Sequence, residues 1–508
     1  MPSPFFFRAR STVAALVIAF FAWNGTPIFA ADAPAQTALP IPKERTVVTH
    51  HTVRVGGNAL AYDATAGTML LRNEKDEPTA SVFYTAYTVR GAHRPVTFLF
   101  NGGPGSSSMW LHIGSVGPRR IVTNDAGNTP PAPYRIAENP STLLDRSDLV
   151  FIDAVGTGFS TLAGKGDGKE YYGVDQDARA FAQFIRRFVA KYDRWNAPKF
   201  LFGESYGTTR AANVVNVLAG QGMDFTGVIL LSTVLNFATL DSSGPSDDLV
   251  YPLFLPTEAA VAWYHDKIPN KPADLPTFLG TVRTFAAGDY MTALARGASL
   301  DPSTRAAIVD KLSAYTGLSK AFVALSDLRV GPDRFEKELM RDRRLTVGRL
   351  DGRYLGADLD ATSDSPEYDP TDAAISGPFT SVFNAYVRDD LKWQPEREYK
   401  PTNYGVVNRN WDFKRAGRDA GATNVAGDLA TAMTKNPNLR VFSANGYYDL
   451  ATPFFATDYT LAHLGLAPAL AAHVTYGYYP SGHMVYMNPP SLVNLKSDLA
   501  SFYASAIR

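Results

Sequence analysis

The segment that most constrains the fold is an apolar run that leads directly into a Gly-x-Ser-x-Gly pentapeptide. Residues 199–202 are typical of a short buried strand, the pentapeptide occupies residues 203–207 with Ser205 at its centre, and residues 206–220 have a helical pattern. Small residues two positions before and after a serine allow a sharp strand-to-helix turn, a nucleophile elbow, which exposes the hydroxyl. A glycine-containing loop that matches by chance is the alternative. The strand–turn–helix context favours the elbow.

The overall composition is that of an ordinary globular enzyme. The 508 residues are 45% hydrophobic and 19% charged, enough for one large domain with an insertion or for two domains. The formal net charge is zero and no basic face is interleaved with aromatic residues, so we expect no nucleic-acid partner. The chain has no cysteine, which excludes disulfides, a thiol nucleophile and a cysteine-bound metal.

Residues 1–30 have the features of a secretory signal peptide. Arg8 and Arg10 precede an apolar stretch at residues 11–23, and the small residue at the end of 28–30 suits a cleavage site. The apolar stretch is shorter than the roughly 20 residues that a membrane-spanning helix needs. An uncleaved N-terminal anchor is the alternative. We expect an exported protein, periplasmic or extracellular, without stable membrane insertion after cleavage.

The rest of the chain is predicted to form a two-part core around an insertion. In the first part, residues 31–240, short β-branched and aromatic runs between residues 45 and 100 predict antiparallel strands. From residue 148 onward, strand-type runs alternate with helical patterns, which predicts a parallel sheet. Strand character returns in the second part, residues 401–508. These runs lie at residues 148–153, 200–202, 227–232, 439–446 and 472–477, and an amphipathic helix lies at 175–191.

Residues 241–400 interrupt this alternation and are predicted to form a helical cap. Helical stretches such as residues 302–315 and 334–344 are joined by loops rich in proline, glycine and aspartate. The second stretch alternates charges, which indicates an exposed surface. The acidic residues 358–372 lack the spacing of a calcium-binding loop and are predicted to form a solvated loop.

A serine nucleophile needs a general base, and the base needs an orienting carboxylate. His483 lies in a loop of small residues after the last strand-type run, and Asp449 follows the run that ends near Ala444. The order Ser205, Asp449, His483 is the chain order of the triad in α/β-hydrolases. We therefore predict an α/β-hydrolase fold, a mostly parallel central sheet flanked by helices, with an inserted helical cap.

Negative charge that develops on the substrate oxygen needs backbone N–H donors. Tyr206, the residue after the nucleophile, supplies one. The glycine-rich residues 101–105 follow the strand-type run 96–100 and are placed to supply another. A phosphate-binding loop is the alternative, but the segment matches neither common phosphate-loop pattern.

Five motifs, in the same order along the chain, resemble those of the serine carboxypeptidases of the S10 class. By this resemblance the chain is similar to a disulfide-free member of bacterial type. The motifs are Asn-Gly-Gly-Pro-Gly with trailing serines at 101–108, Val-Gly-Thr-Gly-Phe-Ser at 155–160, Gly-Glu-Ser-Tyr-Gly at 203–207, Gly-x-x-Asp-x-x-x-Pro at 446–453 and Gly-His-Met-Val at 482–485. The resemblance runs from about residue 60 to 508, apart from the cap. It implies that amides of Gly103 and Tyr206 form the oxyanion hole, and that no cofactor or metal is required.

The resemblance also implies that Glu204 and Asn101 hold the C-terminal carboxylate of a substrate. Two carboxylates share a hydrogen bond only if one is protonated, so peptidase activity is expected to favour acidic pH. A purely structural role for Glu204 inside the elbow is the alternative. The chain departs from the family pattern at Leu99 (often tryptophan), Ser106 (usually cysteine) and Ser115 (usually an acid). These changes leave the triad intact and concern carboxylate recognition.

The expected function is that of an exported serine carboxypeptidase. It is expected to hydrolyse C-terminal peptide bonds of peptides with a free C-terminus through an acyl-enzyme on Ser205, with His483 as base and Asp449 orienting it. An esterase or acyltransferase with the same triad is the first alternative. A non-catalytic binding protein on this fold is the second. No oligomeric state is predicted.

Overall fold

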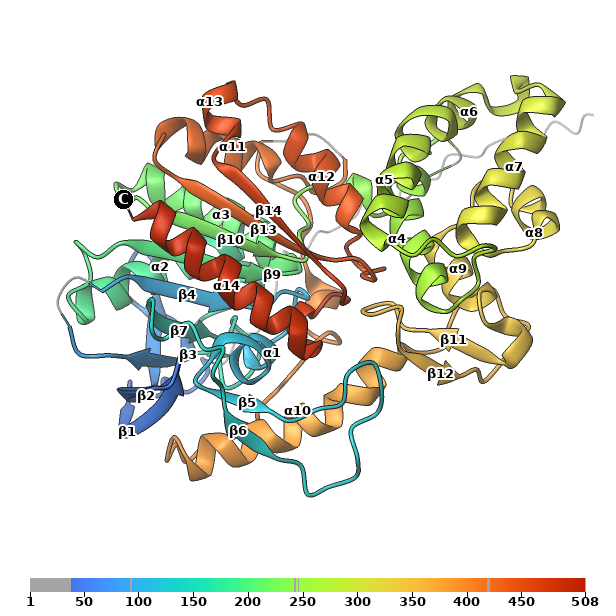
Figure 1. The fold of residues 1–508 in the computed structure, drawn as a ribbon. Helices are drawn as coiled ribbons and strands as arrows, with labels where there is room; N and C mark the ends of the chain where they lie inside the picture. The colour runs from blue at the N-terminus through green and yellow to red at the C-terminus, as the bar shows by residue number, and fades with distance from the viewer. Residues whose placement is uncertain (1–37, 92–93, 242–243, 245, 418–420, 508) are drawn as a thin grey trace, which may run out of the picture. The chain divides into compact units, whose positions relative to one another are not determined.

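A large sheet forms the centre of the computed structural model (Figure 1). The structure describes residues 38–91, 94–241, 244, 246–417 and 421–507, and within them this sheet has ten strands. Nine lie side by side in the order β1 (Thr46–Val55), β2 (Asn58–Arg72), β3 (Pro78–Thr88), β7 (Asp148–Ile152), β4 (Val96–Phe100), β9 (Lys199–Glu204), β10 (Gly227–Leu231), β13 (Arg440–Gly446) and β14 (Val474–Tyr479). The tenth, β8 (Thr161–Leu162), pairs with β3.

The sheet is antiparallel at one edge and parallel elsewhere. β1, β2 and β3 form antiparallel pairs, and β1 turns into β2 at Gly56 and Gly57, whose φ values of 56° and 84° suit glycine. From β7 to β14 all neighbours are parallel. The prediction of antiparallel strands is therefore correct for β1 to β3 and wrong for residues 96–100. β4 is buried along its whole length inside the parallel region, where crossover connections set strand direction.

Helices cover both faces of the sheet. Alternate residues of β4 point to opposite faces: Phe98 and Phe100 pack with one helical layer, and Leu99 packs with the other. The first layer holds α2 (Val174–Lys191), α3 (Tyr206–Gly220) and α11 (Ala426–Lys435). The second holds α1 (Met109–Leu111), α10 (Pro370–Asp389) and α14 (Pro489–Ala506), the last of which runs along the sheet in Figure 1. This arrangement is the α/β-hydrolase fold predicted from the sequence.

A group of helices between β10 and β13 has an apolar core of its own. Its elements are α4 (Val250–Tyr264), α5 (Leu275–Phe285), α6 (Met291–Arg296), α7 (Pro302–Thr316), α8 (Lys320–Leu325), α9 (Pro332–Glu338) and the hairpin of β11 (Leu345–Val347) and β12 (Leu355–Ala357). We refer to residues 250–357 as the cap. Helix α10 follows the cap but packs on the main core, where Phe379 contacts Trp110 and Phe383 contacts His112.

The remaining strands and α-helices are short. They are the hairpin of β5 (Arg119–Ile121) and β6 (Ile136–Glu138), and helices α12 (Phe454–Ala462) and α13 (Pro468–Ala471). Within the described segments, no helix is both long enough and apolar enough to cross a membrane. The signal peptide predicted at residues 1–30 lies outside the described residues.

Two expectations about charge in the cap region are wrong in part. Residues 334–344 were predicted to be exposed, but the side chain of Lys337 is fully buried. It forms ion pairs with Asp358, which is also buried, and with Glu367 at 3.1 Å. Asp358 belongs to the segment 358–372, which was predicted to be solvated. The lysine and the aspartate neutralise each other, so both side chains can be buried.

A buried carboxyl group in the cap predicts a specific pH dependence of stability. Glu258 of α4 is 3% exposed, its Oε1 has no hydrogen-bond partner among the described residues, and burial raises its pKa from 4.5 to about 8. The folded state holds the proton of Glu258 more tightly than the unfolded chain does. The stabilisation of the folded state by this proton is therefore fully present below pH 4.5 and is lost as the pH rises towards 8.

Glu258→Gln should therefore stabilise the protein relative to wild type at pH 8 more than at pH 5. The wild-type free energy of unfolding should lose up to about 1.4 kcal/mol per pH unit in this range from this group alone. Denaturant unfolding followed by circular dichroism at both pH values measures the difference. The exposed Glu74→Gln serves as control, and an equal effect of Glu258→Gln at both pH values would contradict the expectation.

Candidate active site

The elbow predicted at residues 203–207 is present between β9 and α3. Ser205 has φ 61° and ψ −131°, a conformation that non-glycine residues rarely adopt. Both flanking glycines lie where a side chain would clash. A Cβ on Gly203 would come within 2.0 Å of the Gly207 carbonyl oxygen, and one on Gly207 within 2.7 Å of the Phe100 carbonyl oxygen. The glycines of the motif are therefore required by the backbone packing around the serine.

The structure brings His483 and Asp449 together. His483 Nδ1 lies 2.9 Å from Asp449 Oδ2, and both residues are buried. The other oxygen, Oδ1, accepts hydrogen bonds of 2.9 Å from the backbone N–H groups of Ala451 and Thr452. The Thr452 hydroxyl donates to Oδ2 at 2.6 Å and lies 3.1 Å from His483 Nδ1. The carboxylate is thus held on both oxygens and can orient the imidazole.

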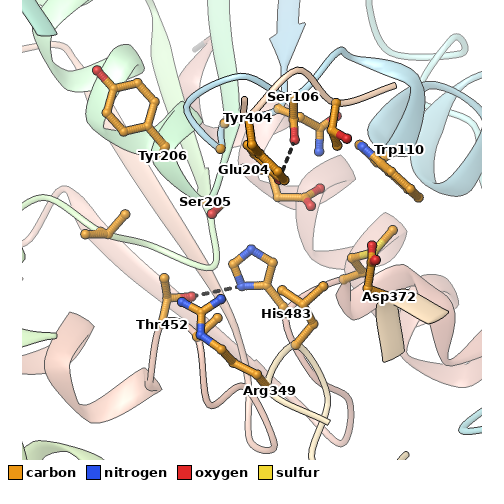
Figure 2. A pocket seen from close by; sticks show the side chains of 18 of the residues that line it. Ser106, Trp110, Glu204, Ser205, Tyr206, Arg349, Asp372, Tyr404, Thr452 and His483 are labelled. Carbon is orange, nitrogen blue, oxygen red and sulfur yellow. Dashed lines mark hydrogen bonds between the residues drawn. The ribbon is translucent and has the colours of Figure 1, made fainter. Parts of the chain in front are cut away.

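The environment of His483 favours its protonated form. Burial acts to lower the pKa, but the charge of Asp449, the hydrogen bond to it and the charge of Glu204 together raise the pKa above 6.5. When Nδ1–H donates to Asp449, Nε2 is left free to accept a proton. Figure 2 shows the Ser205 hydroxyl and the His483 ring facing the same pocket, with the Thr452 contact on the opposite edge of the ring. This arrangement can activate a serine hydroxyl.

The pocket has a volume of about 180 Å³ and is lined by Gly103 and Tyr206 among other residues. The glycine loop packs backbone to backbone on the elbow, since a Cβ on Gly102 would lie 2.4 Å from the Tyr206 nitrogen. Among the described residues, no acceptor is bound to the amide of Gly103 or of Tyr206. The Tyr206 side chain points away from the pocket and packs on Trp411, so only its backbone faces the site (Figure 2). Two free amides therefore lie beside Ser205.

Asn101 and Glu204 also lie in this pocket. Burial raises the pKa of Glu204 to about 7, against the opposing effects of the His483 charge and of hydrogen bonds from Tyr486 and Asn101. The Tyr486 hydroxyl donates to Glu204 Oε2 at 2.9 Å. The carboxyl group of Glu204 is therefore protonated in mildly acidic solution. A neutral carboxyl and an amide side by side can both donate to an incoming carboxylate.

Asp153, just before the motif at residues 155–160, holds the end of the first motif. Asp153 Oδ1 accepts hydrogen bonds from the Ser108 backbone N–H at 2.9 Å, from the Ser108 hydroxyl at 2.8 Å and from the Tyr399 hydroxyl at 3.1 Å. A Cβ on Gly158 would lie 1.8 Å from Asp153 Oδ2, so the glycine makes room for this carboxylate. Ser108, the last of the trailing serines, is thus held by Asp153, and Gly158 of the second motif leaves room for the Asp153 carboxylate.

The three positions that depart from the family pattern have different surroundings. Ser106 lines the pocket and lies 3.0 Å from the Tyr404 hydroxyl (Figure 2). Leu99 and Ser115 are fully buried and do not line the pocket. The Ser115 hydroxyl has no hydrogen-bond partner among the described residues. The departure that changes the wall of the pocket is therefore the one at Ser106.

The cap contacts both catalytic loops through residues 349–352. The Leu450 N–H donates to the Arg349 carbonyl at 3.1 Å, beside the aspartate. The His483 N–H donates to the Leu350 carbonyl at 2.6 Å. These bonds connect the acid loop to the histidine loop through the cap.

Sequence reasoning missed several residues of the site. Thr452 and Tyr486 lie inside or just beyond two of the motifs, and this proximity was the available signal. Arg210 of α3 is buried and donates to the Asn101 carbonyl while its guanidinium pairs with Asp177 at 2.6 Å. The only available sequence signal for Arg210 was its place in the predicted helix, little more than one turn after Ser205. Arg349 reaches the pocket from the cap, and no sequence signal identified it.

Thr452→Val is expected to slow the reaction of Ser205 with a fluorophosphonate by about tenfold or more. The change keeps the shape of the side chain and removes the hydroxyl that donates to Asp449, and hydrogen bonds to charged groups contribute about 1.5 to 3 kcal/mol. Thr452→Ser keeps the hydroxyl and should label at nearly the wild-type rate. The labelling rate can be followed by gel fluorescence, and equal rates for Thr452→Val and wild type would contradict the role of Thr452.

Part of this chain is similar to known serine carboxypeptidases. Residues 64–231 match the family model described as serine carboxypeptidase. A curated relative, the pheromone-processing carboxypeptidase KEX1 of Metarhizium acridum, is 32% identical over 121 residues, which is 23% of this chain and 17% of that protein.

The solved structures that are similar include a putative aryl esterase from Burkholderia cenocepacia (12% identity, TM-score 0.38, 87% of this chain and 99% of that chain covered). A carboxyl esterase from Bacillus coagulans is also similar (13% identity, TM-score 0.36, 87% and 98% covered). The family model and the curated relative support a serine hydrolase, and the similarity to serine carboxypeptidases covers residues 64–231 of this chain.

Proposed function

We propose that this protein is an exported serine carboxypeptidase that removes C-terminal residues from peptides. The observation that carries the proposal is Glu204, a buried carboxyl group with a pKa of about 7 in the same pocket as Ser205 and His483. A triad and an oxyanion hole serve any acyl transfer. A protonatable acid beside an asparagine amide provides, in addition, a site for a free carboxylate. The sequence pattern of residues 1–30 supports export.

Acylation in this proposal begins when His483 Nε2 takes the proton of the Ser205 hydroxyl. The serine oxygen attacks the carbonyl carbon of the last peptide bond, and the amides of Gly103 and Tyr206 stabilise the oxyanion. When the intermediate collapses, the C–N bond breaks and His483 gives its proton to the leaving amine. The C-terminal amino acid departs, and the rest of the peptide remains as an ester on Ser205. Water, deprotonated by His483, then hydrolyses this ester.

The leaving residue is recognised by its carboxylate. Protonated Glu204 donates one hydrogen bond and the Asn101 amide another. Once Glu204 ionises, two negative charges face each other in a buried pocket, and binding is lost. Because the pKa of Glu204 is about 7, the proposal predicts that peptide hydrolysis declines as the pH rises above 7. Protonation of His483, whose pKa is raised above 6.5, limits the rate at the acidic end.

A comparison of matched substrates tests the requirement for a free carboxylate. We expect an N-blocked dipeptide to be hydrolysed at pH 6 at least about tenfold faster, as kcat/KM, than the same dipeptide with a C-terminal amide, because the amide cannot replace the carboxylate at a site built for it. A simple ester of the blocked residue serves as a control for acyl-enzyme chemistry. Equal rates on all three would overturn the carboxypeptidase proposal in favour of an esterase or acyltransferase.

The pH profiles of Glu204→Gln and Tyr486→Phe test the role of Glu204. A glutamine stays neutral at every pH, so the decline of kcat/KM above pH 7 on the blocked dipeptide should disappear in Glu204→Gln. The Tyr486 hydrogen bond lowers the pKa of Glu204, so its removal in Tyr486→Phe should shift the decline to higher pH. An unchanged profile in Glu204→Gln would refute the assignment of Glu204 to carboxylate binding.

A further inference from the structure

Arg349 is a cation in the active-site pocket that forms no ion pair with any carboxylate of the described segments. It lies between β11 and β12 of the cap, its side chain is exposed, and it lines the pocket that holds Ser205 and His483 (Figure 2). Among the described residues, no carboxylate oxygen lies within 4.0 Å of its guanidinium and the guanidinium donates no hydrogen bond, although its charge opposes the burial that raises the pKa values of the more distant Glu336 and Asp369. Two other arginines nearby are paired: Arg329 with Asp248 at 2.7 Å and Arg353 with Asp351 at 2.6 Å.

Arg349 lies on the side of the pocket away from Glu204. Together with Phe237, Leu240 and Ala451, it lines both the catalytic pocket and an adjoining hollow of about 670 Å³ against α4 and α9. Glu204 lines the catalytic pocket alone. In Figure 2, Arg349 and Glu204 lie on opposite sides of the His483 ring. Arg349 is therefore at the junction where the pocket opens into the second hollow, away from the carboxylate site.

The direction of the substrate follows from this arrangement. If Glu204 holds the carboxylate of the leaving residue, the acyl part of the peptide extends from Ser205 to the other side of the pocket. The first side chain on that side belongs to the penultimate residue of the peptide. It would enter the part of the pocket shared by Arg349, Phe237 and Leu240.

We propose that Arg349 binds the side-chain carboxylate of the penultimate residue, so that the protein prefers peptides with Asp or Glu at that position. This inference rests on the proposed function. A guanidinium binds a carboxylate through two parallel hydrogen bonds, and it stays charged at every pH at which the enzyme works. Because no carboxylate in the part of the chain that the structure describes forms an ion pair with Arg349, none of these has to be displaced when the substrate binds. The second charged group in the pocket, Asp372 of α10, lies on the opposite wall beyond His483 (Figure 2).

The effect of Arg349 on substrate preference can be separated from its effect on the general base, His483. Its charge also acts to lower the pKa of His483, so a substitution that removes the charge shifts the activity on all substrates. A ratio between two substrates that differ only in the penultimate charge cancels this common effect. Glutamate and glutamine are suitable because they have the same shape and differ in charge at pH 6.

The experiment measures kcat/KM at pH 6 for N-blocked dipeptides with Glu or Gln before a common C-terminal residue. Wild type should prefer Glu by about tenfold, since charge-assisted bidentate hydrogen bonds are about twice as strong as neutral ones. Arg349→Met should bring the Glu/Gln ratio close to one, and Arg349→Lys should retain part of the preference. Arg343→Met is the control, because Arg343 is an exposed arginine of the cap that lines neither hollow. Stoichiometric fluorophosphonate labelling shows that each variant is folded.

The same ratio on blocked Glu and Gln ethyl esters distinguishes the two proposals. If wild type cleaves the esters with the expected preference but does not cleave the dipeptides, the carboxypeptidase proposal fails and the binding role of Arg349 stands on the acyl side. If wild type cleaves both kinds of substrate with a Glu/Gln ratio near one, or with a ratio that Arg349→Met leaves unchanged, the inference about Arg349 is overturned while the proposed function stands.

Discussion

The backbone of the elbow packs against the backbone of the loop after β4 with no room for a side chain between them. Cβ atoms on Gly102, Gly203 or Gly207 would come within 2.0 to 2.7 Å of backbone atoms. This contact fixes three things at once: the strained φ of Ser205, the direction of the Tyr206 amide, and the distance between the serine and the glycine loop. Because the amides are held by covalent geometry and close packing, they need no rearrangement when negative charge develops beside them.

The cap contributes to the catalytic geometry as well as to the pocket wall. Tyr448 and Leu450, which flank Asp449, are buried in the apolar core of the cap. The Leu350 carbonyl accepts from the His483 N–H, and Gly482 donates to Asp351 Oδ2 at 3.1 Å. The carboxylate and the imidazole are therefore attached to the sheet on one side and to the cap on the other. A change in the cap is expected to affect the general base before it affects Ser205, whose position depends on β9, α3 and their contacts with β10 and the loop after β4.

Much of this site could be predicted because its members mark the ends of strands. The carboxyl ends of parallel strands share one edge of the sheet, so residues that follow β4, β9, β13 and β14 meet there regardless of their separation in the sequence. Strand ends located Ser205, Asp449, His483 and the glycine loop, whereas the roles of Asn101 and Glu204 came from the resemblance to serine carboxypeptidases. The rule could not locate Thr452 or Tyr486, because their roles depend on which way a hydroxyl points after the loops have packed. The composition of residues 96–100 led to a wrong strand direction, because direction depends on the connection between strands and not on composition.

The sequence by itself determined the strand-to-helix turn at Ser205, the glycines that permit it and the order of the triad, because each depends on local backbone sterics or on the alternation of strands and helices. The tertiary structure alone decided the environment of each charge. Lys337 is buried because Asp358 reaches it from a distant loop, Glu204 keeps a proton near neutral pH because the core surrounds it, and Arg349 is left unpaired in the pocket. Burial and Coulomb interactions depend on distances through space, and these exist only once the cap, the loops and the sheet have come together.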